Sequence, residues 1–330
     1  MKAAIVGIAG PAVGPEEAAL FRAHPPAGVI LFARNIQDPA GLAALTRDLR
    51  HVLPAGAAIM VDQEGGRVAR LRPPHWRAHP PAGAIGDLFA RDPRAGLRAA
   101  WLTGALIGLD CSAAGFDLVA APVLDLSVPG AHDVIGDRAY ATDPAIVARL
   151  ARAVAEGLMA GGVIPIGKHA PGHGRARVDS HLSLPRVDAN DLDADLLPFA
   201  ANANLPWFMT AHIVYAALDP ISPATLSGPV IERVIRGRMG FRGVLVTDDL
   251  AMKALSGTPA DLAARALAAG CDVALYCPGD FEGTRDVLAA CPAITPSTQA
   301  RMATARAMVR HRIVALDGAA LSAERDRLLA

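Results

Sequence analysis

Eight short apolar runs rich in β-branched residues recur along the chain, and longer stretches rich in alanine, leucine and arginine separate them. The runs are 3–9, 28–33, 57–62, 116–125, 163–169, 207–212, 243–249 and 272–277. The intervening stretches 39–53, 94–115, 144–162 and 259–270 have the length and composition of helices. A continuous apolar strand followed by a helix, repeated, is typical of a parallel sheet covered by helices. Eight such units favour a closed (β/α)8 barrel, an α/β fold, over an open doubly wound sheet.

Polar residues lie at or just after the carboxyl end of five of these runs. In a (β/α)8 barrel this end forms the active-site face, so the side chains are expected to meet around one pocket. The residues are Asp62, Asp125, Lys168 with His169, His212, and Asp248 with Asp249.

The length of 330 residues fits one barrel of about 250 residues with insertions. We therefore expect residues 1–330 to form a single (β/α)8 catalytic domain. The tail after about residue 295 predicts two helices packed on the barrel, with a solvated basic face.

Charge and apolar patterning exclude several classes of partner. Lys plus Arg number 32 and Asp plus Glu number 32, and no long basic run occurs, so a nucleic-acid partner is not expected. No segment reaches the roughly 18 apolar residues of a membrane span, and run 3–9 is interpreted as a strand rather than a signal sequence. The four cysteines lack CxxC spacing, which indicates reduced core thiols in a cytoplasmic protein. We expect a monomer without a metal or other cofactor.

The segment 168–185, KHAPGHGRARVDSHLSLP, is the most specific motif. Lys168 and His169 end the fifth strand, and a glycine-rich loop then carries Asp179 and His181. An aspartate two residues before a histidine can bind one imidazole nitrogen and fix the tautomer, as in a catalytic dyad. A DxH pair on its own is more often structural, but its place after a strand-end Lys-His favours function.

A second motif, GVLVTDDLAMKAL at 243–255, delivers Asp248 and Asp249 to the same face. Because successive strand residues point in opposite directions, only one of them is expected to act in the chemistry. The other could cap the following segment or anchor a neighbouring cation, and helix capping is an equal alternative for the pair.

Two further segments carry polar groups suited to a hydroxyl-rich ligand. In VDQEGGRVARLR (61–72), Asp62 ends a strand, Gly65-Gly66 predicts a tight turn, and three arginines including Arg70 follow. The rival interpretation is a phosphate-binding loop, but neither GxxxxGK[ST] nor GxGxxG occurs. In VIGDRAY (134–140), Arg138 could equally be a ligand or a surface residue.

Taken together and in this order, these segments resemble glycoside hydrolase family 3, and within it the bacterial N-acetyl-β-glucosaminidases of peptidoglycan recycling. GVILFARN (28–35) and FMTAHIVY (208–215) belong to the same pattern, which covers nearly the whole chain. Two departures are Ala170, where the family often has Phe, and Thr247, where Ser is common.

The resemblance implies roles for individual residues. It implies that Asp248 is the nucleophile of a retaining glycosidase, that His181 is the general acid/base, and that Asp179 supports His181. It also implies that the substrate is a terminal β-linked N-acetylglucosamine on 1,6-anhydro-N-acetylmuramic acid, with or without peptide. The positions that match the family's sugar-binding residues are Asp62, Arg70, Arg138, Lys168 and His169.

Three alternatives accompany this β-N-acetylhexosaminidase interpretation. A histidine acid/base repels inorganic phosphate less than a carboxylate does, so phosphorolysis could replace hydrolysis. A metal-dependent barrel hydrolase could use His169, His173, His181, His212 and Asp248 as ligands, although the first strand lacks the HxH typical of such enzymes. A non-catalytic sugar-binding barrel is disfavoured because competent residues occupy both proposed catalytic positions.

Overall fold

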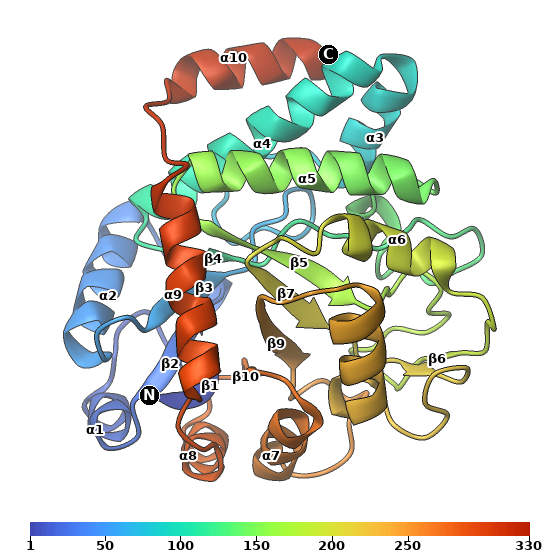
Figure 1. Cartoon of the computed structure of the whole chain (residues 1–330). Helices are drawn as coiled ribbons and strands as arrows, with labels where there is room; N and C mark the ends of the chain where they lie inside the picture. The colour runs from blue at the N-terminus through green and yellow to red at the C-terminus, as the bar shows by residue number, and fades with distance from the viewer.

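The computed structural model describes residues 1–330, and eight parallel strands close into a barrel at its centre (Figure 1). Going round the barrel, the strands follow one another in chain order, and β10 pairs back with β1. The predicted closed barrel is therefore confirmed. Its strands are β1 (Lys2–Gly7), β2 (Pro26–Leu31), β3 (Ala58–Val61), β4 (Leu118–Val119), β5 (Ile164–Ala170), β7 (Trp207–Thr210), β9 (Val244–Asp249) and β10 (Val273–Tyr276).

The fourth strand is much shorter than the predicted run 116–125, because only Leu118–Val119 pairs regularly. Pro122 has no N–H to donate, so the backbone leaves the regular pairing there. A single bridge between Val123 and Lys168 keeps the segment against β5. Asp125 consequently lies in a loop beyond the strand, above the mouth of the barrel.

Most helices of the outer layer begin with a cap that the sequence encodes directly. Four of them start with an Asp or Thr whose side chain accepts a backbone N–H, followed by proline at the first helical position. These four are α2 (Pro39–Val52), α4 (Pro93–Ala113), α5 (Pro144–Ala160) and α7 (Pro259–Ala269), and they confirm the four predicted helices. The layer also contains α1 (Pro15–Ala23), α3 (Ala82–Arg91), α6 (Asp193–Ala201), a π-helix (Val230–Arg238) and α8 (Phe281–Ala290).

Two apolar clusters stabilise the barrel. The larger one fills the space between the strands and the surrounding helices. The smaller one fills the barrel interior, and it includes Trp207 together with Met302, Ala305 and Val309. Since these last three residues lie on α9 (Pro296–Arg310), this helix covers the amino-terminal end of the barrel and leaves the carboxyl end open.

The second tail helix, α10 (Gly318–Leu329), packs on the helical layer of the barrel, so two C-terminal helices pack on the barrel as predicted. Its main contacts are with α4 and α3, so it lies on the outer helices rather than on the strands (Figure 1). The buried Arg325 holds it there, donating to His79 Nδ1 at 3.1 Å and to the Ala78 carbonyl at 3.2 Å.

A small parallel sheet of β6 (Arg186–Val187) and β8 (Val214–Tyr215) lies outside the barrel. It anchors the long segment between β5 and α6, which contains the predicted Asp179-His181 pair. Among all helices, none combines the length and apolarity that crossing a lipid bilayer requires.

Candidate active site

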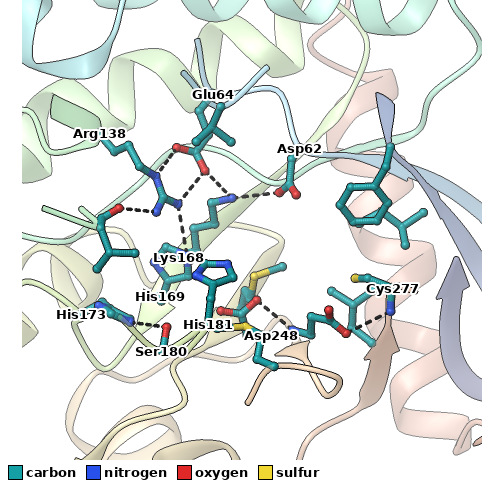
Figure 2. A pocket seen from close by; sticks show the side chains of 18 of the residues that line it. Asp62, Glu64, Arg138, Lys168, His169, His173, Ser180, His181, Asp248 and Cys277 are labelled. Carbon is teal, nitrogen blue, oxygen red and sulfur yellow. Dashed lines mark hydrogen bonds and ion pairs between the residues drawn. The ribbon is translucent and has the colours of Figure 1, made fainter. Parts of the chain in front are cut away.

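A pocket of about 330 Å³ opens at the carboxyl end of the barrel, where β3, β5 and β9 end. Seven of the eight predicted site residues line it, and Figure 2 shows how those other than Arg70 converge. The seven are Asp62, Arg70, Arg138, Lys168, His169, His181 and Asp248. The eighth, Asp179, lies outside the pocket lining and bonds to His181.

A chain of ion pairs forms one wall of the pocket. Lys168 Nζ lies 3.0 Å from an Asp62 oxygen and 2.6 Å from a Glu64 oxygen. Arg138 donates two hydrogen bonds to Glu64, at 2.8 and 2.9 Å, and Arg70 pairs with Asp62 at 3.1 Å. Three cations and two carboxylates are therefore interleaved on a largely buried surface, presenting both donors and acceptors to a ligand.

Burial and ion pairing shift the pKa values of this wall in opposite directions, and the effect of ion pairing is the larger one. Burial alone would raise the pKa of Glu64, but Arg138 and Lys168 hold that pKa far below its usual value. The pKa of Asp62 is also lowered, because Lys168 and Arg70 outweigh its burial. The pKa of Lys168 is raised by the two carboxylates in spite of burial. The wall is fully ionised at neutral pH.

The backbone of the turn after β3 is held in place by a buried side chain and by close packing. Gln63 is buried, and its Oε1 accepts the backbone N–H groups of Arg70 and Leu71 at 2.7 and 3.0 Å. Gly65 has φ +105°, and a β-carbon there would lie 2.3 Å from the Pro80 carbonyl oxygen. The Gly65-Gly66 turn predicted from the sequence is thus required by close backbone packing.

Asp125 fixes the orientation of His169. Its carboxylate lies 2.6 Å from His169 Nδ1 and accepts the backbone N–H of His173, also at 2.6 Å. Because a carboxylate is an acceptor, Nδ1 carries the proton and Nε2 can accept from Arg138, 3.5 Å away. His169 therefore enters the pocket with a defined tautomer, beside the ion-pair wall.

Asp248 and Asp249 divide their tasks, as alternation along a strand predicts. Both aspartates line the pocket, and Asp248 accepts the Asp249 N–H at 2.8 Å. Burial would raise the pKa of Asp248, but nearby His169 and His212 and the Asp249 N–H keep it below the usual value. The Asp249 carboxylate instead accepts backbone N–H groups of Ala251 and Cys277, each at 3.0 Å. Asp249 thus anchors the turn after β9, and Asp248 remains an ionised carboxylate facing the cavity.

His181 lies on the loop between β5 and β6 and remains largely exposed, with 62% of its side chain accessible. Asp179 Oδ1 is 2.7 Å from His181 Nδ1 and also accepts the His181 backbone N–H at 2.8 Å. Slight burial would raise the pKa of Asp179, but these contacts with His181 lower it. With Nδ1 bound to a carboxylate, Nε2 of His181 is the nitrogen left for a ligand.

Ser180, between these two residues, attaches the loop to the barrel. Its buried hydroxyl lies 3.0 Å from His173 Nε2, and its carbonyl accepts the Ala254 N–H at 3.2 Å. The pKa of His173 is lowered to about 4 by burial and by His169, so His173 is neutral at pH 7.

The remaining histidine of the cluster, His212, is held beneath Asp248. Its Nε2 lies 2.9 Å from the Asp249 carbonyl oxygen, and its Nδ1 lies 2.8 Å from the Thr225 hydroxyl. Burial lowers the pKa of His212, so it positions this carbonyl as a neutral donor. No group of three histidine, cysteine or acidic side chains in the protein is arranged to hold a metal ion.

Two charged residues of the pocket, Glu64 and Arg34, were not predicted as site residues from the sequence. Glu64 joins Lys168 to Arg138, and its signal was the alternation of Asp62 and Glu64, which places both side chains on one side of an extended segment. Arg34 also lines the pocket and donates to the carbonyls of Ile8 and Cys277 at 3.0 and 2.5 Å. It lies within the segment GVILFARN, but a lone arginine there gave no chemical signal.

Comparison with known proteins agrees with this geometry. Residues 8–312 match the model of the glycosyl hydrolase family 3 N-terminal domain. A β-hexosaminidase of Bordetella avium is 40% identical over 83% of this chain and 79% of its own length. A β-hexosaminidase of Xylella fastidiosa (strain 9a5c) is 41% identical over 83% of this chain and 82% of its own length.

Solved structures show the same relationship. NagZ from Neisseria gonorrhoeae, in complex with N-trifluoroacetyl-D-glucosamine, superposes with a TM-score of 0.89 at 31% identity, covering 100% of this chain and 98% of that one. A family 3 β-N-acetylglucosaminidase from Paenibacillus sp. gives a TM-score of 0.85 at 29% identity, covering 99% of this chain and 66% of that one. The chain therefore belongs to glycosyl hydrolase family 3, on its β-hexosaminidase branch.

Proposed function

We propose that this β-hexosaminidase is a retaining exo-β-N-acetylglucosaminidase whose 330 residues form one catalytic domain. Its substrate is a terminal β-linked N-acetylglucosamine on 1,6-anhydro-N-acetylmuramic acid, with or without an attached peptide. The observation that carries the proposal is the convergence of an ionised Asp248, a histidine on a loop and a wall of paired charges on one pocket.

Asp248 is the nucleophile in this proposal. A lowered pKa keeps the Asp248 carboxylate ionised. The carboxylate of the adjacent Asp249 already accepts two backbone N–H groups. The Asp248 carboxylate attacks the anomeric carbon, and the bond to the glycosidic oxygen breaks. This step forms a covalent glycosyl-enzyme, as in other retaining glycosidases.

His181 supplies the proton for the leaving oxygen. Most glycosidases use a second carboxyl group whose pKa must be raised, whereas a histidine titrates near neutrality without a large shift. Asp179 binds Nδ1 and stabilises the imidazolium, so Nε2 is the atom that donates. Because the side chain is largely exposed, the loop must move inward before the proton can be transferred, and this closure can limit turnover.

The second half of the reaction reverses these roles. The neutral His181 accepts a proton from a water molecule while the oxygen of that water attacks the anomeric carbon. The bond to Asp248 breaks, the carboxylate is regenerated, and the sugar leaves with its original β configuration.

The ion-pair wall binds the sugar. Each sugar hydroxyl can donate to Asp62 or Glu64 and accept from Arg70, Arg138 or Lys168, and the paired charges fix these groups before the ligand arrives. A volume near 330 Å³ lies at the small end of ligand pockets and suits one terminal residue better than the interior of a polymer. The gonococcal relative's complex with N-trifluoroacetyl-D-glucosamine supports a glucosamine-type ligand at this site.

The four buried free cysteines suit a reducing cytoplasm, as does a disaccharide fragment as substrate. We therefore place the enzyme in the cytoplasm, and we expect it to be a monomer.

Turnover of an aryl N-acetyl-β-glucosaminide beside the matching aryl β-glucoside tests reaction and substrate together. We expect the acetamido substrate to be hydrolysed at least 100-fold faster by kcat/KM. Equal turnover of both would overturn the assignment. The product is analysed with and without inorganic phosphate, and a sugar 1-phosphate as the main product would replace hydrolysis by phosphorolysis.

A further inference from the structure

A second pocket, of about 530 Å³, is lined in part by the loop that carries His181. Three segments line it: residues 128–131, the loop residues Arg175 and Arg177, and residues 186–189 around β6. None of these residues belongs to the sugar pocket. We call this second cavity the arginine pocket.

The lining of the arginine pocket is strongly cationic. It contains three arginines, Arg175, Arg177 and Arg186, against a single carboxylate, Asp188, which gives three positive charges minus one, or +2. Asp188 is paired with Arg186 at 2.7 Å, so it does not balance the other two guanidinium groups.

Many guanidinium donors in this pocket have no partner. Arg177 makes no hydrogen bond or ion pair, and it is exposed. Arg175 uses only its Nε, which lies 2.7 Å from the buried Asp195 on α6. Arg186 uses its Nε and Nη1, the latter on the Pro220 carbonyl at 3.0 Å. Since each guanidinium offers five N–H donors in a planar fork, the free groups match planar anions such as carboxylates.

The arginine pocket and the sugar pocket are built from the same two loops. The backbone N–H of His132 donates to the Ala176 carbonyl at 2.8 Å, which joins the loop after β4 to the loop after β5. Further along these loops, Val134 and Ile135 on one and Ser180 and His181 on the other line the sugar pocket. The two pockets are therefore lined by neighbouring stretches of the same joined loops.

We infer that the arginine pocket binds carboxylates on the leaving group while the terminal sugar occupies the neighbouring pocket. This inference rests on the proposed function, because it assigns a leaving group to that reaction. A neutral oligosaccharide would leave the net charge of +2 and the free guanidinium donors uncompensated, whereas an acidic leaving group satisfies both. Binding at Arg175 and Arg177 also contacts the loop only a few residues before His181.

Arg177→Gln tests the inference, because Arg177 has no partner that the substitution could disrupt. Two substrates are compared: a neutral aryl N-acetyl-β-glucosaminide, and N-acetylglucosamine linked to 1,6-anhydro-N-acetylmuramic acid bearing an Ala-Glu peptide. The readout is the ratio of kcat/KM for the acidic substrate to kcat/KM for the neutral one. Arg265→Gln on the exposed side of α7 removes the same charge elsewhere and serves as the control.

We expect Arg177→Gln to lower this ratio about five- to tenfold, the scale of one lost charge-assisted interaction. Arg265→Gln should keep the wild-type ratio, and 0.5 M salt should lower the ratio of the wild type through screening. A ratio that stays at the wild-type value in Arg177→Gln overturns the inference, even if hydrolysis itself is confirmed.

A binding measurement separates failure of this inference from failure of the proposed function. If the wild type hydrolysed neither substrate, the proposed function would be wrong, but calorimetric titration with the free Ala-Glu-bearing leaving group would still test the arginine pocket. Weak binding that Arg177→Gln removes and Arg265→Gln retains supports the inference. Binding of equal strength in all three proteins, or no binding at low salt, overturns it.

Discussion

At the scale of single residues, the carboxylate of Glu64 lies between two cations that would otherwise repel one another. It accepts two hydrogen bonds from Arg138 and pairs with Lys168 at 2.6 Å. The side chains of all three are largely buried, so solvent screens their ion pairs only weakly. Glu64 therefore positions the two cations that we assign to the sugar, and it also lines the sugar pocket itself.

Glu64→Gln preserves the shape of this residue and removes its charge. We expect the free energy of unfolding to fall by about 3 kcal/mol, because the substitution leaves the buried Arg138 without its carboxylate partner. We also expect KM to rise about tenfold with a smaller change in kcat, since ground-state sugar contacts are lost. Urea unfolding and steady-state kinetics provide the two measurements.

Glu156→Gln, at an exposed position of α5, is the matched control and should change neither quantity. If Glu64→Gln behaved like this control, the ion-pair wall would have no part in binding.

The role of His181 can be separated from a structural one by varying the leaving group. Only poor leaving groups require protonation, so His181→Ala should reduce kcat/KM for an alkyl glycoside by about 10³-fold. Activated aryl glycosides should lose no more than about tenfold, because their oxygen leaves as a stable anion. Equal losses for the two substrate types would mean that His181 does not act as the acid.

At the scale of elements, the loop between β5 and β6 determines where His181 lies. Its attachment depends on Asp125, which binds the start of the loop, and on the contact between Ser180 and His173. The Lys-His ending of the strand and the Asp179-His181 pair could be predicted because they are local in sequence. The contact between Asp125 and His173 could not, because it joins segments that follow two different strands. The contact between Ser180 and His173 could not, because it depends on the folded shape of the loop.

The same distinction holds for regular elements. Helices with an Asp or Thr cap and a following proline, such as α5 after Asp143, begin where their sequence indicates. The predicted strand 116–125 ended early at β4, since pairing with neighbours, and not apolar length, sets its limits. The tail helix α10 was correctly predicted as a helix, but its packing on α4 depends on a buried arginine contact with His79.

Ser180→Ala should loosen the loop without unfolding the barrel. Loss of one hydrogen bond worth about 1 kcal/mol predicts a roughly fivefold decrease of kcat for substrates that need proton donation. The melting temperature should change little. Ser183→Ala, at an exposed position on the same loop without a side-chain hydrogen bond, serves as the control. Identical kinetics for both variants would contradict an anchoring role for Ser180.

At the scale of the whole molecule, stability should decrease as the pH falls below neutrality. Buried His79, His173 and His212 all have a lowered pKa, so the unfolded chain binds protons at a higher pH than the folded one. Their contribution is fully present above pH 6.5, the pKa of an unperturbed histidine, and is lost toward the folded-state value, about 4 for His173. The lowered pKa values of Asp62, Asp125 and Asp248 extend the loss to more acidic pH.

Urea unfolding between pH 7.5 and pH 5 checks this expectation. His173 alone should account for up to about 2 kcal/mol of the decrease by pH 5, since its folded pKa lies well below the unfolded one. His173→Gln should flatten the pH dependence by that amount. A free energy of unfolding that is constant or increases over this range would contradict the neutral, buried state of these histidines.

The molecule as a whole leaves one end of the barrel for chemistry and closes the other. Packing of Met302, Ala305 and Val309 from α9 seals the amino-terminal end, and every proposed catalytic group is at the open carboxyl end. The strand-helix alternation was sufficient to predict the barrel and its active-site end, but not that α9 closes the other end. It could not indicate which of several strand-end carboxylates is ionised and free, because that depends on neighbours from β5, β7 and β9 together.

The covalent step on Asp248 is the central claim, and trapping the intermediate tests it most directly. The protein is incubated with 5-fluoro-N-acetyl-β-glucosaminyl fluoride, digested and analysed by peptide mass spectrometry. We predict a mass increase of one 5-fluoro-N-acetylglucosaminyl group on the peptide containing Asp248, with fragment ions locating it on Asp248 and not on Asp249. Asp248→Ala should show no adduct and no measurable turnover. An adduct on another residue, or an Asp248→Ala protein that still hydrolyses the substrate, would contradict the account.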